Sequence, residues 1–511
     1  MNDPDFLAPD SLDPPPLAVI DIGSNSVRLV IFQMLGAFPV VLFNESLSCR
    51  LGKGLDKTGR LNPDGVKMVF DNLPRFRAVC DAMDVSHMTP LATAAVRDAS
   101  DGAEFVRAAA RILGTEIQIL TGDQEAVTSA EGVLRGIYDA DGIVCDMGGG
   151  SMELAMVEKG TVGETVTLPL GSMRLEQPGS DRRRKMQDHV ARELAGVSWL
   201  DQGSGRSAYL VGGAWRALAR AHMHLSGYPV KMVHNYALSA QEAREAANVM
   251  LTIESAILGA VPRMSRKRIE TMPSAAIGLL GVLDHMRPRQ VVFSTYGLRE
   301  GRIFGHMPPN GPEHDWFLAA AADYARRTIH ESLSADVLVK WAEPLFEDAS
   351  RAHRRIFLGA CHLSNLGWAD HPEDRAYHVM NRCLRIAVPG LDHPSRAFIA
   401  LALFRRYNGE LSDERLSRLD GLLSVAEKNE AVTLGLVLRL AYFISAGDSR
   451  VLAATRLHRA DGKLVLSVGS VAQPFLGDVV HRRLDDLAKA LGLNPVLVIE
   501  GEGGRADSRR A

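Results

Sequence analysis

Two stretches of the chain share one plan, and this repeat restricts the possible folds more than any other feature. "LAVIDIGSNSVRLVIFQ" covers residues 17–33, and "GIVCDMGGGSMELAMVE" covers residues 142–158. Each consists of an apolar strand that ends in an aspartate, a loop of small residues and a second apolar strand. The stretches align without a gap, so that Asp21 corresponds to Asp146. Because the copies begin about one small domain apart, the repeat predicts two cognate α/β domains.

The composition changes in blocks along the rest of the chain. Strand patterns alternate with helical patterns in the first two blocks, long amphipathic segments dominate the third, and a strand–helix–strand pattern ends the chain. We expect a flexible leader at 1–16, an α/β domain at 17–127, a second at 128–307, a helical domain at 308–450, a small α/β domain at 451–502 and a disordered tail at 503–511.

Composition and charge restrict the class of protein. The 511 residues are 46% hydrophobic and 23% charged, as in soluble multidomain proteins. A net charge of −3 gives no overall field to attract nucleic acid or an anionic membrane, so we expect neither as a partner. The five cysteines lack CxxC spacing, the chain has no apolar run of about 20 residues, and the N-terminus is acidic and proline-rich. Together these features predict reduced thiols and a cytoplasmic location.

The repeated loops indicate phosphate binding. Small residues after a strand expose several backbone N–H groups, which can hold a phosphate. An aspartate beside an anion is unfavourable unless a divalent cation or a water lies between them. Either loop alone is more simply explained as a tight hairpin. The repetition favours two loops that face each other across one phosphoryl group.

Several motifs carry a family resemblance. "DIGSNSVRL", "CRLGKGLDKTGRL", "ATAAVRDASDG", "LTGDQEA", "CDMGGGSMEL", "LPLGSMRL" and "YGLREG" occur in the order found in the Ppx/GppA phosphatases, which are exopolyphosphatases and guanosine pentaphosphate phosphohydrolases. The resemblance covers residues 17–306, and the order of domains resembles the long exopolyphosphatases. It implies an α/β fold with duplicated domains like those of actin, the heat-shock chaperones and the sugar kinases (ribonuclease H-like), followed by an all-α HD-like domain and a small C-terminal α/β domain.

The resemblance also implies roles for individual residues. Asp146 looks like the carboxylate associated with Mg²⁺, and Glu153 could support the metal or only orient the loop. Arg97 looks like the arginine that grips the terminal phosphate with its planar fork; alternatively, it forms an exposed charge pair with Asp98. The phosphate-binding loops would be Gly23, Ser24, Asn25 and Ser26, and Gly148, Gly149, Gly150 and Ser151.

Glu125 matches the catalytic glutamate of this family. Hydrolysis of a phosphoanhydride needs a water aimed in line with the leaving oxygen, and a nearby carboxylate can orient it and accept its proton. The family often has a second acid just before this glutamate, but here the position is Gln124. Alternatively, Glu125 merely caps the helix that begins here, a role worth about 1 kcal/mol.

Two basic clusters are candidates for a polyphosphate track, although most such runs are solvated helix faces. They contain Arg182, Arg183, Arg184 and Lys185, and Arg263, Arg266, Lys267 and Arg268. Gly212 and Gly213 resemble a third phosphate-facing motif, which holds the nucleotide in relatives that bind ATP. Trp215 follows closely, so the sequence does not reveal whether the motif meets an adenosine here.

The helical block resembles the HD-like region of long exopolyphosphatases. A working HD phosphohydrolase needs an adjacent His-Asp pair for metal, but the pair position reads His362-Leu363. We therefore predict a structural and substrate-channelling platform. The alternative is a metal site built from His353, His362, His371 and His378.

These observations predict an exopolyphosphatase that releases the terminal phosphate of polyphosphate processively, with Mg²⁺ and a water activated by Glu125. The alternatives are hydrolysis of pppGpp to ppGpp, a sugar kinase, a chaperone-like ATP-dependent binding protein, and a non-catalytic regulator that binds polyphosphate or (p)ppGpp. A kinase is disfavoured by Glu125 and "LREG", and a non-catalytic regulator by the presence of Glu125 and Asp146. We also expect a homodimer, with pppGpp or ppGpp as a further substrate or inhibitor.

Overall fold

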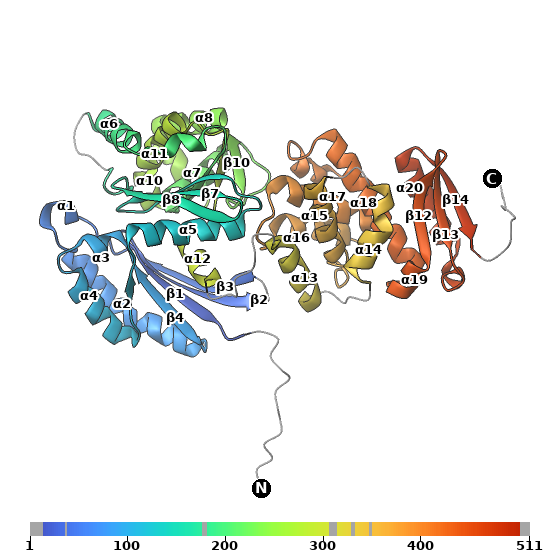
Figure 1. Ribbon diagram of the computed structural model, residues 1–511, viewed down its shortest axis with the longest axis horizontal. Coiled ribbons are helices and arrows are strands. Elements are labelled where there is room, and N and C mark those ends of the chain that lie inside the picture. Colours follow the sequence, from blue (N-terminus) through green and yellow to red (C-terminus); the bar gives the residue numbers. More distant parts are fainter. Residues whose placement is uncertain are drawn as a thin grey trace, which may run out of the picture. The chain divides into compact units, whose positions relative to one another are not determined.

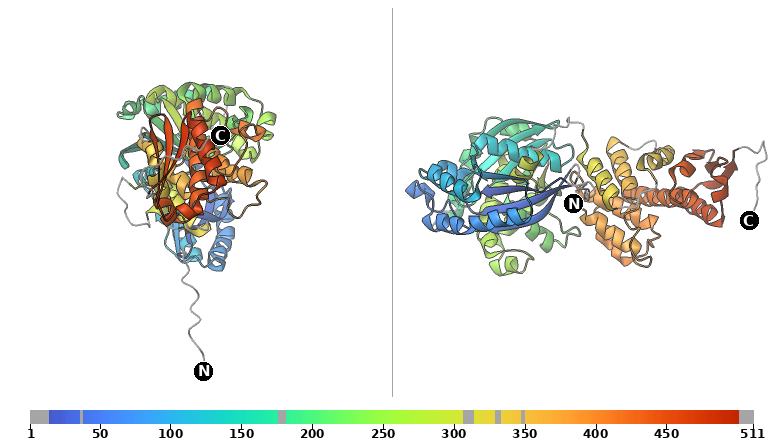
Figure 2. Two further views of the ribbon diagram at one scale, coloured as in Figure 1. Left: turned by 90° about the vertical axis from the view of Figure 1, so that its right-hand side faces the viewer. Right: turned by 90° about the horizontal axis from the view of Figure 1, so that it is seen from below.

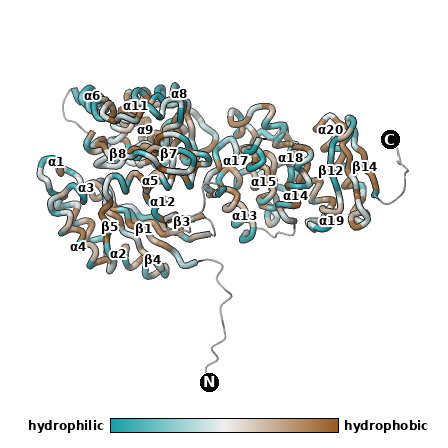
Figure 3. Tube along the Cα trace, in the orientation of Figure 1, coloured by the Kyte–Doolittle hydropathy of each residue, from teal (hydrophilic) through white to brown (hydrophobic). Residues whose placement is uncertain are grey.

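The computed structural model describes residues 14–35, 38–175, 181–305, 314–328, 333–346 and 350–500. It forms two compact units, Met1–Trp316 and Phe317–Ala511. The leader expected at 1–16 lies almost wholly outside the described residues, as does the tail expected at 503–511. Apolar stretches are short and are interrupted by hydrophilic residues in both units (Figure 3). Within the described ranges, no helix is long and apolar enough to cross a membrane.

The first sheet of unit 1 lies among helices (Figures 1 and 2). Its order is β3-β2-β1-β4-β5, where β1 pairs antiparallel with β2 and parallel with β4. Ala18, Ile20 and Ile22 of β1 pack in one core with the helices α2 and α4, whereas Val19 contributes to a core on the other side. Both faces are therefore buried, which explains the nearly continuous apolar run. The elements are β1 (Leu17–Ile22), β2 (Val27–Leu35), β3 (Phe38–Leu47), β4 (His87–Ala92), β5 (Gln118–Ile119), α1 (Leu55–Thr58), α2 (Pro63–Ala82), α3 (Ala94–Asp98) and α4 (Gly102–Leu113).

The second sheet of unit 1 repeats this topology. Its order is β10-β11-β9-β6-β7-β8, so β8-β7-β6-β9 corresponds to β3-β2-β1-β4. The hairpin β6–β7 is antiparallel and β6 pairs parallel with β9, as in the first sheet. The predicted duplication is therefore confirmed in the fold of the strands. The strands are β6 (Gly142–Met147), β7 (Met152–Glu158), β8 (Thr161–Leu168), β9 (Ser207–Val211), β10 (Tyr236–Ser239) and β11 (Gln290–Phe293).

Helices cover both faces of the second sheet. Ile143 and Cys145 of β6 pack in a core with α7 and α11, and Val144 between them packs against Ala126, Ala130 and Val133 of α5. The helices of this half are α5 (Gly122–Gly136), α6 (Arg182–Ala195), α7 (Gly213–Leu225), α8 (Ala240–Thr252), α9 (Ser255–Gly259), α10 (Arg266–Glu270), α11 (Met272–Met286) and α12 (Leu298–Phe304).

One of the expected domain boundaries can be placed on these elements. The boundary expected between residues 127 and 128 falls inside α5, a helix that packs on β7 and β8 of the second sheet. The boundary expected between residues 307 and 308 lies among residues outside the described ranges, and the two compact units divide after Trp316.

Unit 2 begins with helices and ends in a small sheet. Its helices are α13 (Trp316–Thr328), which starts one residue before the division, α14 (Ala335–Ala342), α15 (Arg351–His362), α16 (Arg375–Arg385), α17 (His393–Arg406), α18 (Val425–Ser445), α19 (Ser449–Ala453) and α20 (Asp478–Leu491). The sheet has the order β12-β13-β14, formed by Thr455–Ala460, Lys463–Val468 and Asn494–Ile499. The C-terminal strand–helix–strand is thus present as β13, α20 and β14, and β12 is an addition.

The four histidines of the helical block do not form a metal site. No group of three or more His, Cys, Asp or Glu side chains lies together in a way that could hold a metal among the described residues, which include all four. His353 instead lies 3.6 Å from Glu430. The alternative of a metal site built from these histidines is therefore wrong, while the likeness to an HD domain stays a prediction.

Candidate active site

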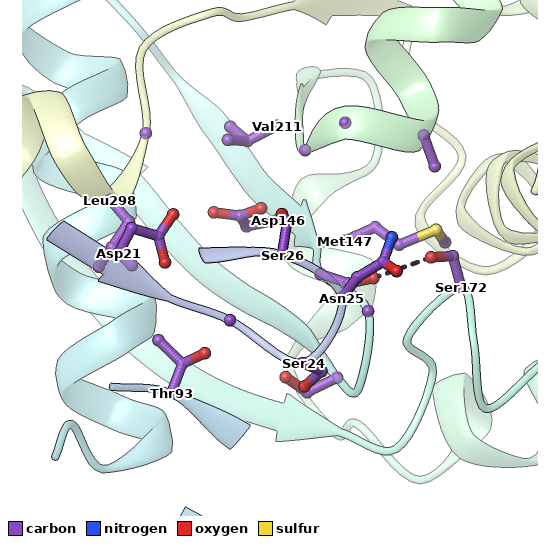
Figure 4. A pocket seen from close by; sticks show the side chains of 18 of the residues that line it. Asp21, Ser24, Asn25, Ser26, Thr93, Asp146, Met147, Ser172, Val211 and Leu298 are labelled. Carbon is purple, nitrogen blue, oxygen red and sulfur yellow. Dashed lines mark hydrogen bonds between the residues drawn. The ribbon is translucent and has the colours of Figure 1, made fainter. Parts of the chain in front are cut away.

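The two repeated loops form the same turn and face one cavity. In the first loop (residues 21–26), Gly23 N donates to Ser26 O at 3.1 Å; in the second (residues 146–151), Gly148 N donates to Ser151 O at 3.0 Å. Both loops line a cavity of about 140 Å³, with room for a few water-sized groups. Figure 4 shows Asp21 and Asp146 beside this cavity, with Ser24, Asn25 and Ser26 on its wall. The prediction that the loops face each other is confirmed.

The first loop lies against Gly149 and Gly150 of the second loop and leaves little room for side chains there. A Cβ added at Gly150 would lie 2.7 Å from Ser24 Oγ, and one added at Gly149 would lie 3.1 Å from Asn25 Cβ. On the other side, Ser172 N and Met173 N donate to the carbonyls of Gly148 and Gly149 at 3.0 and 2.9 Å. The second loop is therefore held from two sides, which fixes the direction of its backbone groups.

The two loop aspartates have different partners. Ser129 Oγ of α5 donates to Asp146 Oδ2 at 2.6 Å, whereas Arg299 Nε of α12 lies 3.9 Å from Asp21 Oδ2. Burial raises the pKa of both carboxyl groups, and Arg299 and Arg216 oppose this rise. A cation between the aspartates would stabilise their charged forms.

This donor set fits Mg²⁺ with few protein ligands. Mg²⁺ is usually bound through one or two carboxylates and completes its octahedron with waters and phosphate oxygens. Asp21 and Asp146 both line the cavity and supply such carboxylates. Across the described part of the chain, no larger group of metal-binding side chains is present. The site therefore suits a Mg²⁺ that arrives with phosphate oxygens, rather than one held in an all-protein cage.

Glu153 lies behind the cavity rather than on its wall. It pairs with Asp146 in the β6–β7 register, is only 2% exposed, and its Oε1 has no hydrogen-bond partner among the described residues. Burial, followed by the charges of Glu125 and Asp146, holds the pKa of Glu153 well above its ordinary value. A carboxyl with a raised pKa loses its proton less readily, as metal binding requires.

Glu125 lines the cavity from the first turn of α5. Thr121 and Gln124 cap this helix: Gln124 N donates to Thr121 Oγ1 at 3.2 Å, and Thr121 N donates to Gln124 Oε1 at 3.0 Å. The alternative in which Glu125 only caps the helix is therefore wrong. Burial raises the pKa of Glu125 to about 7, although Arg97 opposes the rise.

Arg97 contacts Glu125 and does not line the cavity. Its Nη1 donates to Glu125 Oε2 at 3.1 Å and to the carbonyl of Leu120 at 3.0 Å. Asp98 lies 3.6 Å from Arg97 and accepts a 2.6 Å hydrogen bond from Arg174. Arg97 thus combines the expected pairing with Asp98 and a contact to the candidate base; its grip on a terminal phosphate stays a prediction.

Three further arginines line the cavity, and the sequence analysis assigned them no role. They are Arg28 of β2, Arg216 of α7 and Arg299 of α12. Burial lowers the pKa of Arg28 to about 10 and that of Arg216 to about 9, so both are protonated at neutral pH. The sequence does contain a signal for them, because each arginine lies in or directly after a glycine or loop motif, in "SNSVR", "VGGAWR" and "YGLREG". They form a cationic wall able to bind phosphate oxygens.

The predicted polyphosphate track divides into three parts. Arg268 lines the cavity, and Lys267 lines an adjoining groove that shares Ser24, Asn25, Gly149 and Gly150 with the cavity. Arg266 is almost fully exposed and lies 3.5 Å from Glu270. Among the residues of α6, Arg184 is exposed and lies 3.8 Å from Asp188, and neither it, Arg183 nor Lys185 lines the cavity or the groove.

The groove gives this part of unit 1 a cationic surface. Its volume is about 760 Å³, and its six basic residues, Arg50, Lys53, Lys57, Arg174, His189 and Lys267, outnumber its two acidic residues, Asp56 and Glu270. Gly212 and Gly213 lie on the cavity wall, as their motif suggested. Trp215 is fully buried and donates its indole N–H to the carbonyl of Ala275 at 2.9 Å, so it belongs to the core and offers no face to a ligand.

Comparisons with known proteins agree with this geometry. Residues 30–310 match the model of the Ppx/GppA phosphatase family, and residues 333–498 match the model of the exopolyphosphatase C-terminal region. The chain is 25% identical over 459 residues to "Retrograde regulation protein 2" of Saccharomyces cerevisiae, covering 82% of this chain and 77% of that protein. It is 25% identical over 302 residues to "Exopolyphosphatase 1" of Mycobacterium bovis, covering 56% and 87%.

A solved structure also resembles part of this chain. The crystal structure of an exopolyphosphatase from Cytophaga hutchinsonii matches 57% of this chain and 96% of its own, with a TM-score of 0.51 and 22% identity. This likeness shows a shared fold.

Proposed function

The chain belongs to the Ppx/GppA phosphatase family, and from this premise we propose that it is an exopolyphosphatase that releases terminal phosphate from inorganic polyphosphate with Mg²⁺. The observation that carries the proposal is Glu125, a buried carboxyl aimed at a cavity that two phosphate-type loops and a cationic wall also line. A base with a pKa near 7 is half deprotonated at neutral pH, where it can accept a proton.

The chain's own groups divide the work. The backbone N–H groups of the two loops, with Arg28, Arg216 and Arg299, bind the terminal phosphoryl group and orient it. Glu125 orients a water and takes its proton as the water oxygen bonds to phosphorus. The bond from phosphorus to the bridging oxygen breaks, and the shortened chain leaves with that oxygen. Asp21 and Asp146 would hold Mg²⁺, which neutralises charge on the phosphate oxygens.

The groove next to the cavity supports a long substrate. A linear polyphosphate carries about one charge per phosphate, and the basic residues of the groove begin where the cavity ends. A chain that remains bound there after each cleavage would advance by one unit, as processive hydrolysis requires. We further propose a cytoplasmic homodimer; the five cysteines, all buried and unpaired, agree with reducing surroundings.

A second candidate is a regulator that binds polyphosphate or (p)ppGpp. Of the two relatives described above, the one that matches the larger share of this chain is named for regulation. Binding without hydrolysis would use the same loops and arginines. Hydrolysis of pppGpp to ppGpp remains the alternative within the enzyme class, because its terminal phosphoanhydride presents the same reacting group.

The test is phosphate release from long polyphosphate, short polyphosphate, pppGpp and ATP, measured side by side in Mg²⁺ and after chelation. We expect long polyphosphate to be hydrolysed fastest, and chelation to stop release from every substrate. If pppGpp is cleaved faster than polyphosphate, the chain would instead be a phosphohydrolase that converts pppGpp to ppGpp. Tight binding of polyphosphate with no release from any substrate would favour the regulator.

A further inference from the structure

Unit 2 contains a pocket that the proposed function does not use. Its volume is about 370 Å³, within the range of small-molecule sites. It lies where the turn after α15, the start of α16, the end of α17 and the second half of α18 come together; these helices lie side by side in Figure 1. Its lining residues are Asn365, Trp368, Pro372, Arg375, Arg406, Tyr407, Asn408, Arg439, Tyr442 and Phe443.

The pocket is cationic and has no acidic lining. Arg375, Arg406 and Arg439 line it, and no aspartate or glutamate does. Arg406 and Arg439 are only 7% and 8% exposed, and their guanidinium groups bind the neutral side chains of Asn365 and Asn408. Neither has a carboxylate within ion-pair distance in the described ranges, and the Nε atom of each has no hydrogen-bond partner there.

This accumulation of charge is unusual for a purely structural cluster. Buried arginines are ordinarily paired with carboxylates. Asp486 of α20 acts on Arg439, but it also accepts a 2.8 Å hydrogen bond from Arg483, so two arginines share one carboxylate. Burial, then Arg483, lowers the pKa of Arg439 to about 10. A bound anion would compensate the charge that the protein leaves uncompensated.

Aromatic rings occupy the rest of the wall. Arg406 lies between the rings of Tyr407 and Tyr442, at 4.3 and 4.9 Å from their centroids, which fixes the guanidinium plane. Trp368 is 50% exposed, and Tyr442 and Phe443 are 40% and 42% exposed. Single exposed aromatics are common on protein surfaces. Three around one cationic pocket give a planar ligand a surface on which to stack.

We propose that this pocket binds a nucleotide, with its phosphates on Arg375 and Arg439 and its base against Trp368. A polyphosphate chain without a base would use the arginines but leave the aromatic rings unused. The side-chain amides of Asn365 and Asn408 lie beside the pocket and have N–H groups that can meet the edge of a base. The proposal assigns binding alone to this pocket and is independent of hydrolysis in unit 1.

The test is equilibrium binding to the full chain by calorimetry, with GDP and ADP as probes. Tripolyphosphate and guanosine serve as probes that lack the base or the phosphates. Because tripolyphosphate would also bind in the cavity of unit 1, only the part of its binding that Arg439→Gln removes is assigned to this pocket. We expect GDP or ADP to bind the pocket at least about tenfold more tightly than either partial probe. Trp368→Ala and Arg439→Gln should each weaken nucleotide binding by about tenfold or more.

Matched variants separate this site from the cavity of unit 1. Phe475→Ala and Arg450→Gln change an exposed aromatic and an exposed arginine of unit 2 outside the pocket, and should leave binding unchanged. Arg299→Gln should also leave it unchanged. Because Arg439 is buried, thermal melting must show that its variant is folded; Trp368 is half exposed, so its variant tests the proposal independently.

Three outcomes would overturn the proposal. If nucleotide affinity falls with Arg299→Gln but not with Trp368→Ala, the nucleotide binds in unit 1. If the tripolyphosphate binding that Arg439→Gln removes is as tight as that of GDP and Trp368→Ala has no effect, the pocket takes a simple anion. If neither nucleotide binds at millimolar concentration, the pocket has no such ligand.

Discussion

The first and second loops share one backbone turn but differ in their side chains and in the charge beside them. The first carries Ser24, Asn25 and Ser26 where the second carries two glycines and Ser151. Across the hairpin, Asp21 is paired with Arg28, whereas the equivalent residue Asp146 is paired with Glu153. Equivalent positions of the two copies therefore carry a basic residue in one and an acidic residue in the other.

Both differences follow from the two copies meeting at one cavity. Where the loops touch, only the first has room for side chains, so the second has glycines at residues 149 and 150. Near the first loop, Arg28 and Arg299 favour binding of an anion. Near the second, burial raises the pKa of Glu125, Asp146 and Glu153, and the charge of Asp146 adds to the rise at Glu125 and at Glu153, which favours a proton acceptor or a cation. The two copies therefore share a turn but differ in the charges around it.

The largest effect is expected from Glu125→Gln, which removes the proton acceptor beside the second loop and leaves the first loop intact. Turnover should fall by about 10²–10⁴-fold. Affinity for long polyphosphate should be kept or increased, because a negative charge beside a polyanion is gone. Phosphate release and equilibrium binding in Mg²⁺ measure the two effects. Near-normal turnover in a folded variant would assign the base to another group.

The same variant has a predicted effect on stability. The folded-state pKa of Glu125 lies above its ordinary value, so ionisation of this group destabilises the fold as pH rises through about 7. Glu125→Gln has no such ionisation. We expect its melting temperature to exceed that of the parent at pH 8, with the gap narrowing toward pH 5. A gap that widens on acidification would contradict the raised pKa.

Arg28 and Glu153 occupy equivalent positions of the two hairpins, so substitutions of these two residues form a matched pair. Arg28→Gln removes a cation from the cavity wall, and we expect it to weaken substrate binding about 10–100-fold, as loss of a charged hydrogen bond does. Glu153→Gln replaces a buried carboxyl, whose pKa burial holds well above its ordinary value, by a neutral amide of similar shape outside the cavity wall, so turnover should change by no more than a few-fold. Equal losses would show that both positions meet substrate or metal.

The contact between the two loops predicts that glycines of the second loop differ in how well they tolerate an added methyl group. Gly150→Ala brings a Cβ to 2.7 Å from Ser24 Oγ, so we expect a loss of about 1–3 kcal/mol in unfolding free energy. Gly148→Ala meets its nearest atom at 3.5 Å, an ordinary contact, and is the matched control. Denaturant unfolding compares the two variants. Equal stabilities would mean that the loops do not lie against each other in solution.

A smaller effect is expected from Arg97→Gln, because Arg97 acts on the chemistry only through Glu125. Loss of its charge should raise the pKa of Glu125 further and move the rising limb of the pH–rate profile upward by about one to two pH units. Arg174→Gln, which removes a partner of Asp98 but not of Glu125, should leave that limb in place. An unchanged profile for Arg97→Gln would argue against its positioning role.

The sequence was sufficient to predict the duplication, because the repeat of Asp21 at Asp146 reports the same hairpin twice. The sequence also predicted that Glu125 belongs to the site, through a motif rather than through any local property of the residue. The capping role of Gln124 was not foreseen, since a capping box depends on which side chain turns back to the helix start.

Long-range contacts explain most of what the sequence left open. Arg28, Arg216 and Arg299 come from three elements far apart in the chain, and only the fold brings them to one wall. Arg97 was expected on the substrate, but its position beside Glu125 depends on how α3 meets α5. Likewise, the burial of Glu153 follows from covering β7 on both faces, which no local pattern of charge reports.

Helix α5 carries both Glu125 and Ser129, the residue that holds Asp146. These two residues are one helical turn apart, so the rise of an α-helix sets the distance between the proton acceptor and the point where Asp146 is fixed. A hinge motion between the two sheets would open or close the gap between the loops while leaving this spacing unchanged. Such a motion would therefore change the width of the cavity without changing the spacing of the two carboxyl groups on which the proposed hydrolysis depends.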